Sequence, residues 1–518
     1  MRALIGLVVA ISLVGACGGG GDAGGDAARP DGAPAADAAS VVALRVFHTN
    51  DEHGWLAPLE VDGAEYGGVA NVYAHWLAAG FDPTRDLALS SGDNFTGPAL
   101  STWFEGEPAI EAMNVMGYHA SALGNHEFDF GRAILGARAD QAEFPYLAAN
   151  VRLAGSGLPL DFTAPYEIVT IQGVAVGVIG LATLTTPSTT LPANVADLEF
   201  LDPAATLDVV VPEARAMGAE VIVVIAHACQ DELLDAQART TAVVDAWLGG
   251  HCHGPFDAGV TPPVFGTGWA WRSFSVLTIE VDRATHAVVG ASHVTTPVLR
   301  GAGLPAEVTP EPELAALVAR WQGLADDALG DPLGHTVTGL RRVDGWALAN
   351  WIMDAWLVTF PEADVAISNF GGIRADLPTG TITRERVIDL MPFENVIVEL
   401  ELTGAELTAE VASAVARCPV RGSCYPMVAG MTFSIASGAL VITLADGSPV
   451  DAATTYRVLV TDFVYTGGSG YTFAALDPEP TETGVSYRQP AEDFLVGLAT
   501  TDLDPLEAHI DHAPRNDE

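Results

Sequence analysis

The chain has 518 residues, of which 49% are hydrophobic and 17% are charged, a composition that excludes disorder of the whole chain. At roughly 150 residues per domain, this length allows two or three domains. The 66 acidic and 23 basic residues give a net charge of −43, which argues against a general nucleic-acid-binding protein because phosphates would be repelled.

The first 17 residues have the features of a lipoprotein signal peptide. One Arg precedes an apolar stretch, residues 3–14, that is too short to span a bilayer as a stable helix. The sequence Val14-Gly15-Ala16-Cys17 follows it and resembles a bacterial lipobox, in which the cysteine becomes the lipidated first residue. We therefore expect secretion across the inner membrane and a lipid anchor on Cys17, which would hold the protein in the cell envelope at the outer membrane or the periplasmic face. An ordinary secretory signal cleaved nearby is the alternative.

The rest of the chain divides into a tether, two domains and a connector. Residues 18–40 contain almost only Gly, Ala, Asp and Pro, which predicts a flexible tether. Residues 41–300 predict a first domain, residues 301–334 a connector with a helix, and residues 335–518 a second domain.

Short apolar runs alternate with helical patterns in the first domain. We expect strands over 43–48, 86–90, 173–184 and 220–227. Such apolar strands are typical of a sheet that helices bury on both faces. In the second domain we expect a helix over 344–358 and strands near 363–368, 396–402 and 455–463.

Four cysteines remain after Cys17. Cys418 and Cys424 lie six residues apart in a turn-rich segment, which predicts a local disulfide in an oxidising compartment. Cys229 and Cys252 each lie beside histidines and are either paired or free. Metal ligation by their thiols is the least favoured alternative.

Polar residues follow the predicted strands of the first domain in five clusters. The clusters are HTNDEHG with Asp51 and His53, SSGDN with Asp93, LGNHEFDFG with Asn125, His126 and Asp129, IAHAC with His227, and LGGHCHG with His251 and His253. Loops at the carboxyl ends of strands form the sites of α/β folds. Mixed carboxylate, imidazole and amide ligands suit a pair of divalent ions that one carboxylate bridges. His48, His75 and His119 do not fit this set, and we expect them to be structural.

This order of motifs resembles the 5′-nucleotidase family of calcineurin-like metallophosphoesterases over roughly residues 43–500. The resemblance implies an α/β protein: a four-layer α/β/β/α metallophosphoesterase sandwich, a connector helix and a C-terminal α+β substrate-binding domain. It implies two divalent ions, Zn, Mn, Co or Mg. Asp51, His53 and His253 would bind the first ion, and Asn125, His227 and His251 the second, with Asp93 bridging both. His126 and Asp129 match the catalytic dyad of the family.

The resemblance also implies the reaction and its substrates. A hydroxide that bridges the two metals would attack phosphorus and release phosphate from 5′-nucleotides, with UDP-sugars as further candidate substrates. The substrate-binding positions lie in the second domain and are Arg342, Asn369, Gly371, Gly372, Arg374, Phe393, Asn395, Tyr471 and Asp477. Arg374 would grip phosphate, Phe393 and Tyr471 would sandwich the base, Asn395 would contact its edge, and Asp477 the ribose hydroxyls.

Four departures from the family pattern bear on substrate preference. Phe370 stands where a Gly is usual, GGSGY replaces GGDGY, AHACQ replaces a Ser-His pair, and the usual Glu before Asn350 is absent. None touches an expected metal ligand. Two other functions therefore stay open: a related dimetal hydrolase acting on 2′,3′-cyclic nucleotides or on a thiosulfohydrolase-type sulfur ester, and a non-catalytic surface binding protein. The oligomeric state is also open. Catalysis would require domain closure, because the base site and the metals lie on different domains.

Overall fold

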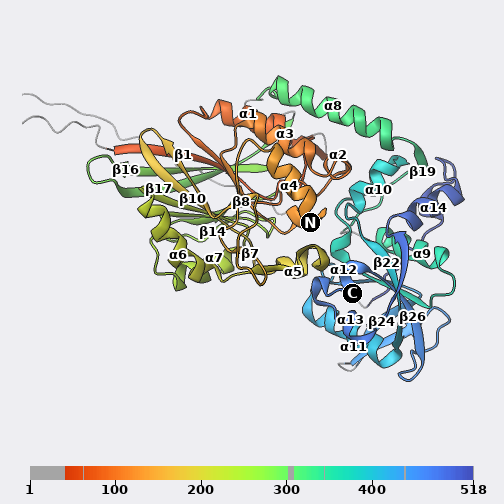
Figure 1. The fold of residues 1–518 in the computed structure, drawn as a ribbon. Helices are drawn as coiled ribbons and strands as arrows, with labels where there is room; N and C mark the ends of the chain where they lie inside the picture. The colour runs from red at the N-terminus through yellow and green to blue at the C-terminus, as the bar shows by residue number, and fades with distance from the viewer. Residues whose placement is uncertain (1–40, 62–63, 302–307, 343–344, 437–438, 517–518) are drawn as a thin grey trace, which may run out of the picture. The chain divides into compact units, whose positions relative to one another are not determined.

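A computed structural model describes residues 41–61, 64–301, 308–342, 345–436 and 439–516 (Figure 1). The predicted signal peptide, the tether and the anchor residue Cys17 lie outside these residues. Among the residues described, no helix combines the length and apolar character needed to cross a membrane.

The first sheet has seven strands in the order β17-β16-β1-β4-β5-β6-β8. Five of its strands run parallel to one another: β1 (Val41–Thr49), β4 (Leu87–Ser90), β5 (Ala120–Ala122), β6 (Tyr146–Leu147) and β8 (Thr163–Ala164). Two antiparallel strands, β16 (Ser273–Asp282) and β17 (Ala287–Pro297), extend the sheet on the other side of β1.

The second sheet has six strands in the order β14-β15-β13-β12-β10-β9. Its parallel strands are β10 (Val174–Leu181), β12 (Val221–Ala226), β13 (Ala246–Gly249) and β15 (Val264–Gly266). Antiparallel strands close both edges: β9 (Tyr166–Ile171) and β14 (Phe256–Asp257). The four runs predicted as strands in the first domain are therefore all strands of these two sheets.

The two sheets pack face to face between two layers of helices. Leu44 and Leu89 of the first sheet share one buried cluster with Val178 and Val223 of the second. The helices α1 (Val69–Ala78), α3 (Glu107–Met116) and α8 (Pro312–Leu329) cover the outer face of the first sheet. The helices α6 (Pro203–Ala216) and α7 (Gln230–Arg239) cover the outer face of the second sheet (Figure 1). Alternation along β1 explains this, because Val46 points toward the second sheet and Phe47 toward the helices. The expected four-layer α/β/β/α sandwich is confirmed.

The connector contains one long helix, α8 (Pro312–Leu329), that packs on the first domain. Its Trp321 ring lies 4.8 Å from the Phe104 ring, and the indole Nε1 donates a hydrogen bond of 2.8 Å to Glu111 Oε2. The helix then leads to β19 (Pro332–Thr336), where the second domain begins.

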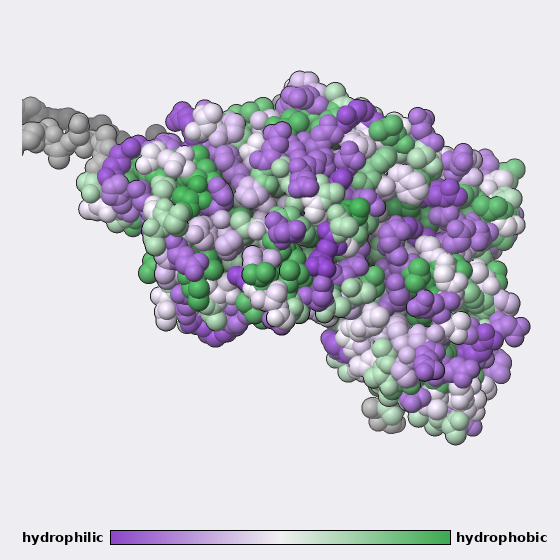
Figure 2. All heavy atoms as spheres, viewed as in Figure 1, coloured by the Kyte–Doolittle hydropathy of each residue, from purple (hydrophilic) through white to green (hydrophobic). Residues whose placement is uncertain are grey.

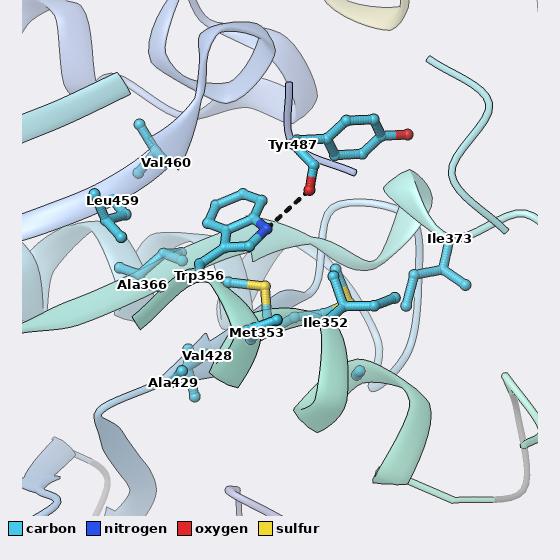
Figure 3. Close-up of a cluster of buried hydrophobic side chains, with 14 of the residues drawn as sticks. Ile352, Met353, Trp356, Ala366, Ile373, Val428, Ala429, Leu459, Val460 and Tyr487 are labelled. Atoms are coloured by element: carbon cyan, nitrogen blue, oxygen red, sulfur yellow. Dashed lines mark hydrogen bonds between the residues drawn. The ribbon is translucent and has the colours of Figure 1, made fainter. Parts of the chain in front are cut away.

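The second domain is built on a five-stranded mixed sheet in the order β23-β20-β26-β22-β27. The strands are β20 (Val365–Asn369), β22 (Val396–Thr403), β23 (Pro426–Ala429), β26 (Thr455–Thr461) and β27 (Thr481–Ser486). Helix α9 (Ala347–Thr359) contributes Ile352, Met353 and Trp356 to the core beside this sheet (Figure 3). The Trp356 indole donates a hydrogen bond of 3.0 Å to Tyr487 O, which satisfies its buried N–H (Figure 3).

Exposed apolar side chains are scattered over the surface. On the face shown in Figure 2, hydrophobic residues are interspersed with hydrophilic ones. Large exposed examples, such as Met217, Val243 and Leu503, come from well-separated segments. Single exposed apolar residues of this kind are ordinary and do not mark a binding surface.

Candidate active site

The polar loops after five parallel strands meet at one edge of the two sheets. Asp51 and His53 follow β1, Asp93 follows β4, Asn125 follows β5, His227 follows β12, and His251 and His253 follow β13. The ligand atoms of Asp51, His53, Asp93 and His253 all lie within 4.8 Å of one another. Those of Asp93, His227 and His251 do the same, and Asn125 Oδ1 lies 3.2 Å from His227 Nε2. The structure thus brings all seven predicted metal ligands into two groups that share Asp93.

Hydrogen bonds behind two of the imidazoles set which nitrogen faces the site. His53 Nδ1 lies 2.7 Å from Thr96 O, and His227 Nδ1 lies 2.8 Å from Ser91 O. A carbonyl accepts only, so each Nδ1 carries a proton and each Nε2 turns inward. The Asn125 amide donates 2.9 Å to Thr189 O, which turns its Oδ1 inward as well.

The atoms that converge at His227 require a positive charge among them. Its Nε2 lies 3.0 Å from Asp93 Oδ2, and the Oδ1 of Asn125 is the other neighbouring oxygen. Burial lowers the pKa of His227, but the carboxylates of Asp93 and Asp51 raise it to about 10. A proton on Nε2 and a metal cation would therefore compete for the same place, and metal binding would release that proton. The donor set fits one divalent cation in each group.

Five of the seven predicted ligands have a left-handed backbone. The φ angles are 52° at Asp51, 47° at His53, 61° at Asp93, 74° at His251 and 55° at His253. This conformation is strained for residues other than Gly and concentrates at functional sites. The loops hold one another in place, since His53 N donates 2.8 Å to Asp93 O and Asp51 N donates 2.9 Å to Gly92 O.

Two buried carboxylates that the sequence analysis did not select support these loops. Glu127 accepts hydrogen bonds from the backbone N–H groups of Asp93, Asn94 and Gly124 at 2.9, 2.6 and 2.6 Å. Glu52 accepts from Ser90 Oγ and Asn94 Nδ2, both at 3.0 Å. Glu52 and Glu127 could have been selected from the sequence only by their position. Each lies next to a residue that was predicted to bind metal or to belong to the catalytic dyad.

His126 and Asp129 form a hydrogen-bonded pair at the edge of the metal groups. His126 Nδ1 lies 2.7 Å from Asp129 Oδ2, and Thr190 Oγ1 donates 2.8 Å to the other carboxylate oxygen. Burial lowers the pKa of His126, but attraction to Asp129 and Asp93 outweighs it and raises the pKa above 6.5. The pair therefore favours an imidazolium whose Nε2 is left for another partner.

A cavity of about 670 Å³ joins the metal groups to the second domain. Seven of the nine predicted substrate residues line it: Arg342, Asn369, Gly371, Gly372, Arg374, Phe393 and Asn395. The Arg374 guanidinium carbon lies 5.8 Å from the centre of the Phe393 ring. The cavity walls therefore combine carboxylates, imidazoles, guanidinium groups and an aromatic ring.

Tyr471 and Asp477, the other two predicted substrate residues, are not among the residues that line this cavity. Tyr471 is 2% exposed, its hydroxyl donates 3.1 Å to Cys424 O, and its ring stacks on Phe473 at 5.4 Å. Asp477 accepts instead from the backbone N–H of Glu401 at 2.9 Å. Among the described residues, neither lines the cavity.

Phe463 and Ser469, which were not predicted from the sequence, line the cavity. Phe463 lies two residues after β26 ends, in the short helix α12 (Asp462–Tyr465). The turn that follows, with Ser469 at a φ of 55°, directs the chain back into the core before Tyr471. Phe463 could have been selected from the sequence as an aromatic residue close to the end of a strand, upstream of the glycine-rich loop.

Two disulfides lie at the cavity. Cys418 pairs with Cys424, and Cys229 pairs with Cys252, which selects one of the alternatives left open for the second pair. Cys229, Cys252 and Cys424 line the cavity.

His48, which we expected to be structural, is buried between Thr267 Oγ1 and Ser91 Oγ, both at 2.8 Å from its ring nitrogens. Burial lowers the pKa of His48 to about 3.

Comparisons with known proteins agree with this geometry. Residues 44–255 match the family "Calcineurin-like phosphoesterase", and residues 332–476 match "5'-nucleotidase, C-terminal domain". Protein UshA of Escherichia coli K12 is 27% identical over 515 residues, which cover 90% of this chain and 92% of that protein. Endonuclease YhcR of Bacillus subtilis is 25% identical over 491 residues, and the chain spans 39% of its length. The crystal structure of a 5′-nucleotidase precursor from Thermus thermophilus has a TM-score of 0.78 and 25% identity, covering 92% of this chain and 99% of that one.

Proposed function

Because the chain belongs to the 5′-nucleotidase family of calcineurin-like phosphoesterases and is a metal-dependent phosphoric ester hydrolase, we propose that it releases phosphate from 5′-nucleotides. The observation that carries this proposal is the shared cavity, which is lined by Asp93 and His126 on one side and by Arg374, Phe393 and Phe463 on the other. UDP-sugars share the phosphate and the flat base and are proposed as further substrates.

Two divalent cations would be held by the two groups that share Asp93. Asp51, His53 and His253 complete the first group, and Asn125, His227 and His251 complete the second. When bound, such cations lower the pKa of a water molecule and neutralise charge on phosphoryl oxygens. The inward-facing nitrogen and oxygen atoms described above support this assignment.

His126 and Asp129 would handle the proton of the leaving group. Asp129 holds Nδ1 of the imidazole at 2.7 Å, so Nε2 is the atom that can donate a proton to the departing alkoxide. The raised pKa of His126 keeps that proton in place near neutral pH, because the carboxylates of Asp129 and Asp93 outweigh the effect of burial.

The second domain would recognise the nucleotide through charge and stacking. Arg374 and Arg342 present guanidinium groups to the cavity, and such groups bind phosphate bidentately. Phe393 and Phe463 would stack on the base, and Asn395 would contact its edge. Stacking suits substrates that share a flat ring and differ in its polar edge.

We propose an extracytoplasmic location with a lipid anchor on Cys17. Both disulfides support an oxidising compartment, since such bonds are rare in proteins kept among cellular reductants. Labelling with a radioactive or clickable fatty acid would test the anchor. Loss of the label in Cys17→Ser is the expected result, and equal labelling would refute it.

The function is tested by hydrolysis of AMP, ATP, UDP-glucose, a 2′,3′-cyclic nucleotide and an aryl phosphate, with Mn²⁺ or Co²⁺ and with EDTA as a control. Free phosphate and the nucleotide products are both measured, because opening a 2′,3′-cyclic phosphate gives a nucleoside monophosphate and no free phosphate. We expect metal-dependent release from AMP that His126→Ala reduces by two orders of magnitude or more, about the range for general acid catalysis. Turnover of the aryl phosphate or the cyclic nucleotide without any turnover of AMP would contradict the nucleotidase proposal and favour the related hydrolase.

A further inference from the structure

The Cys229–Cys252 disulfide joins the two loops that carry three of the proposed metal ligands. We infer that this cross-link is a positioning element for both metal groups, and that its reduction lowers the affinity of the protein for divalent cations. The inference rests on the proposed metal site. It concerns how the chain holds that site and how a dithiol reductant would change it.

Both cysteines of the cross-link lie within two residues of proposed metal ligands. Cys229 lies two residues after His227, in the loop that leaves β12. Cys252 lies between His251 and His253, in the loop that leaves the neighbouring strand β13. The two cysteine Cα atoms are 5.5 Å apart. One covalent bond therefore links His227 to both His251 and His253, and so reaches ligands of both groups.

The loop on the Cys252 side needs such a restraint. His251 and His253, on either side of Cys252, have φ angles of 74° and 55°, where residues other than Gly are strained. His251 N donates to both Asp51 carboxylate oxygens, at 3.0 and 2.9 Å, and His253 Nε2 faces His53 Nε2 at 2.9 Å. These contacts are made by the proposed ligands themselves. The disulfide, in contrast, ties the loop to Cys229, which is not a proposed ligand.

The opposite end of the cross-link is fixed to a helix. Cys229 is the N-terminal cap of α7, and its backbone N–H donates 2.9 Å to Glu232 Oε2. The loop after β12 is therefore anchored by its own helix, and the disulfide transfers that anchor to the loop after β13. His227 Nε2 lies 3.2 Å from His251 Nδ1. Because one atom comes from each loop, this distance depends on the positions of both loops.

The disulfide can be reached from solvent. Both cysteines line the cavity, and Cys252 is exposed. A dithiol would pass two electrons and two protons to the disulfide, which becomes two cysteine thiols, while the dithiol itself becomes a disulfide. With the bond cut, the loop after β13 is free to relax away from the left-handed conformation, and the ligand atoms would no longer converge.

The second disulfide provides a matched control. Cys418–Cys424 lies at the same cavity but joins residues of the second domain, none of which is a proposed metal ligand. We would compare Cys229→Ser/Cys252→Ser with Cys418→Ser/Cys424→Ser and the unmodified protein, using Mn²⁺ titration by calorimetry and circular dichroism to verify folding. The expected result is a dissociation constant at least tenfold weaker in the first variant and within twofold of the unmodified protein in the second.

A reduction experiment keeps the inference testable if the first variant does not fold. Dithiothreitol treatment of Cys418→Ser/Cys424→Ser can cut only Cys229–Cys252, and Mn²⁺ affinity measured after removal of the reductant under anaerobic conditions should fall by the same factor. Unchanged affinity after complete reduction would overturn the inference, as would tighter binding through the freed thiols. If the unmodified, oxidised protein binds no cation, the proposed function fails instead, so the two failures can be told apart.

Discussion

The ring of Phe393 lies nearly parallel to the imidazole of His126, with 5.6 Å between the ring centres and 18° between the planes. The two residues belong to different domains. The face proposed to bind a nucleobase thus adjoins the residue proposed to protonate the leaving group, so one small molecule can reach both.

Phe463→Ala is expected to weaken nucleotide binding, because Phe463 lines the cavity where the base would stack. Stacking on an aromatic side chain is worth about 1–3 kcal/mol per base, so the KM for AMP should rise roughly tenfold. Hydrolysis of an aryl phosphate, which has no base, should change little. Tyr471→Phe is the control, since it keeps the ring and removes only a hydroxyl that donates to Cys424 O. An unchanged KM for AMP in Phe463→Ala would contradict the assignment of Phe463 to base stacking.

Thr190→Val should slow catalysis without removing metal. The Thr190 hydroxyl donates 2.8 Å to the Asp129 oxygen that His126 does not use. A hydrogen bond to a charged group contributes about 1.5–3 kcal/mol, so kcat should fall roughly tenfold or more. Thr190→Ser keeps the hydroxyl and should restore the rate. A change in KM or metal content with unchanged kcat would assign Thr190 a structural role.

Gly124→Ala should disrupt the shared ligand. A Cβ at this position would lie 2.1 Å from Asp93 Oδ1 and 2.6 Å from Asp93 N, and the backbone atom cannot move aside. We expect bound metal to fall below half of that in the unmodified protein, with a loss of stability of about 1–3 kcal/mol. Gly136→Ala, in helix α4 (Gly131–Gln141), is the control because its nearest neighbour is 3.4 Å away. Full metal content in Gly124→Ala would contradict the geometry.

Trp269→Leu should weaken the first metal group. The His253 ring stacks on Trp269 with 5.4 Å between centres and 7° between planes, and Arg272 lies 4.2 Å from the same indole. Trp269→Phe keeps a flat ring and should preserve most of the affinity. Metal content per chain, measured by mass spectrometry after dialysis, should drop from two toward one in Trp269→Leu. Two ions retained in both variants would mean that His253 is held in another way.

Asp389→Asn should stabilise the protein at high pH. Burial raises the pKa of Asp389 to about 6 from 3.8, while the Ala99 N–H, which donates 2.8 Å to Oδ1, opposes this shift. The folded state therefore holds the proton more tightly, and stability falls as pH rises from about 4 to about 6. The asparagine keeps the accepting oxygen and removes the charge. Thermal melts should show that the free energy of unfolding of Asp389→Asn exceeds that of the unmodified protein by up to about 3 kcal/mol at pH 8 and differs little from it at pH 4. An equal difference at both pH values would exclude titration of Asp389 as the cause.

Short motifs at strand ends made the metal groups predictable from the sequence. Asp51 lies two residues after β1 and Asp93 three residues after β4, and parallel strands bring such positions to one edge. The base site was harder because Phe463 and Tyr471 flank the same glycine-rich turn. The structure places Phe463 in the cavity wall and buries Tyr471, and sequence spacing alone does not distinguish the two rings. The pairing of Cys229 with Cys252 required knowing that β12 and β13 are adjacent strands.

The left-handed backbone of Asp51, His53, Asp93, His251 and His253 also limits how this enzyme can be made more robust. Glycine is the residue that would relax each of these positions, yet glycine has no side chain to offer a cation. The proposed cation binding and the local backbone conformation therefore favour different residues at the same positions. Substitutions that raise heat tolerance while keeping these side chains are therefore expected in regions remote from this edge of the sandwich, such as the helical layers or the connector.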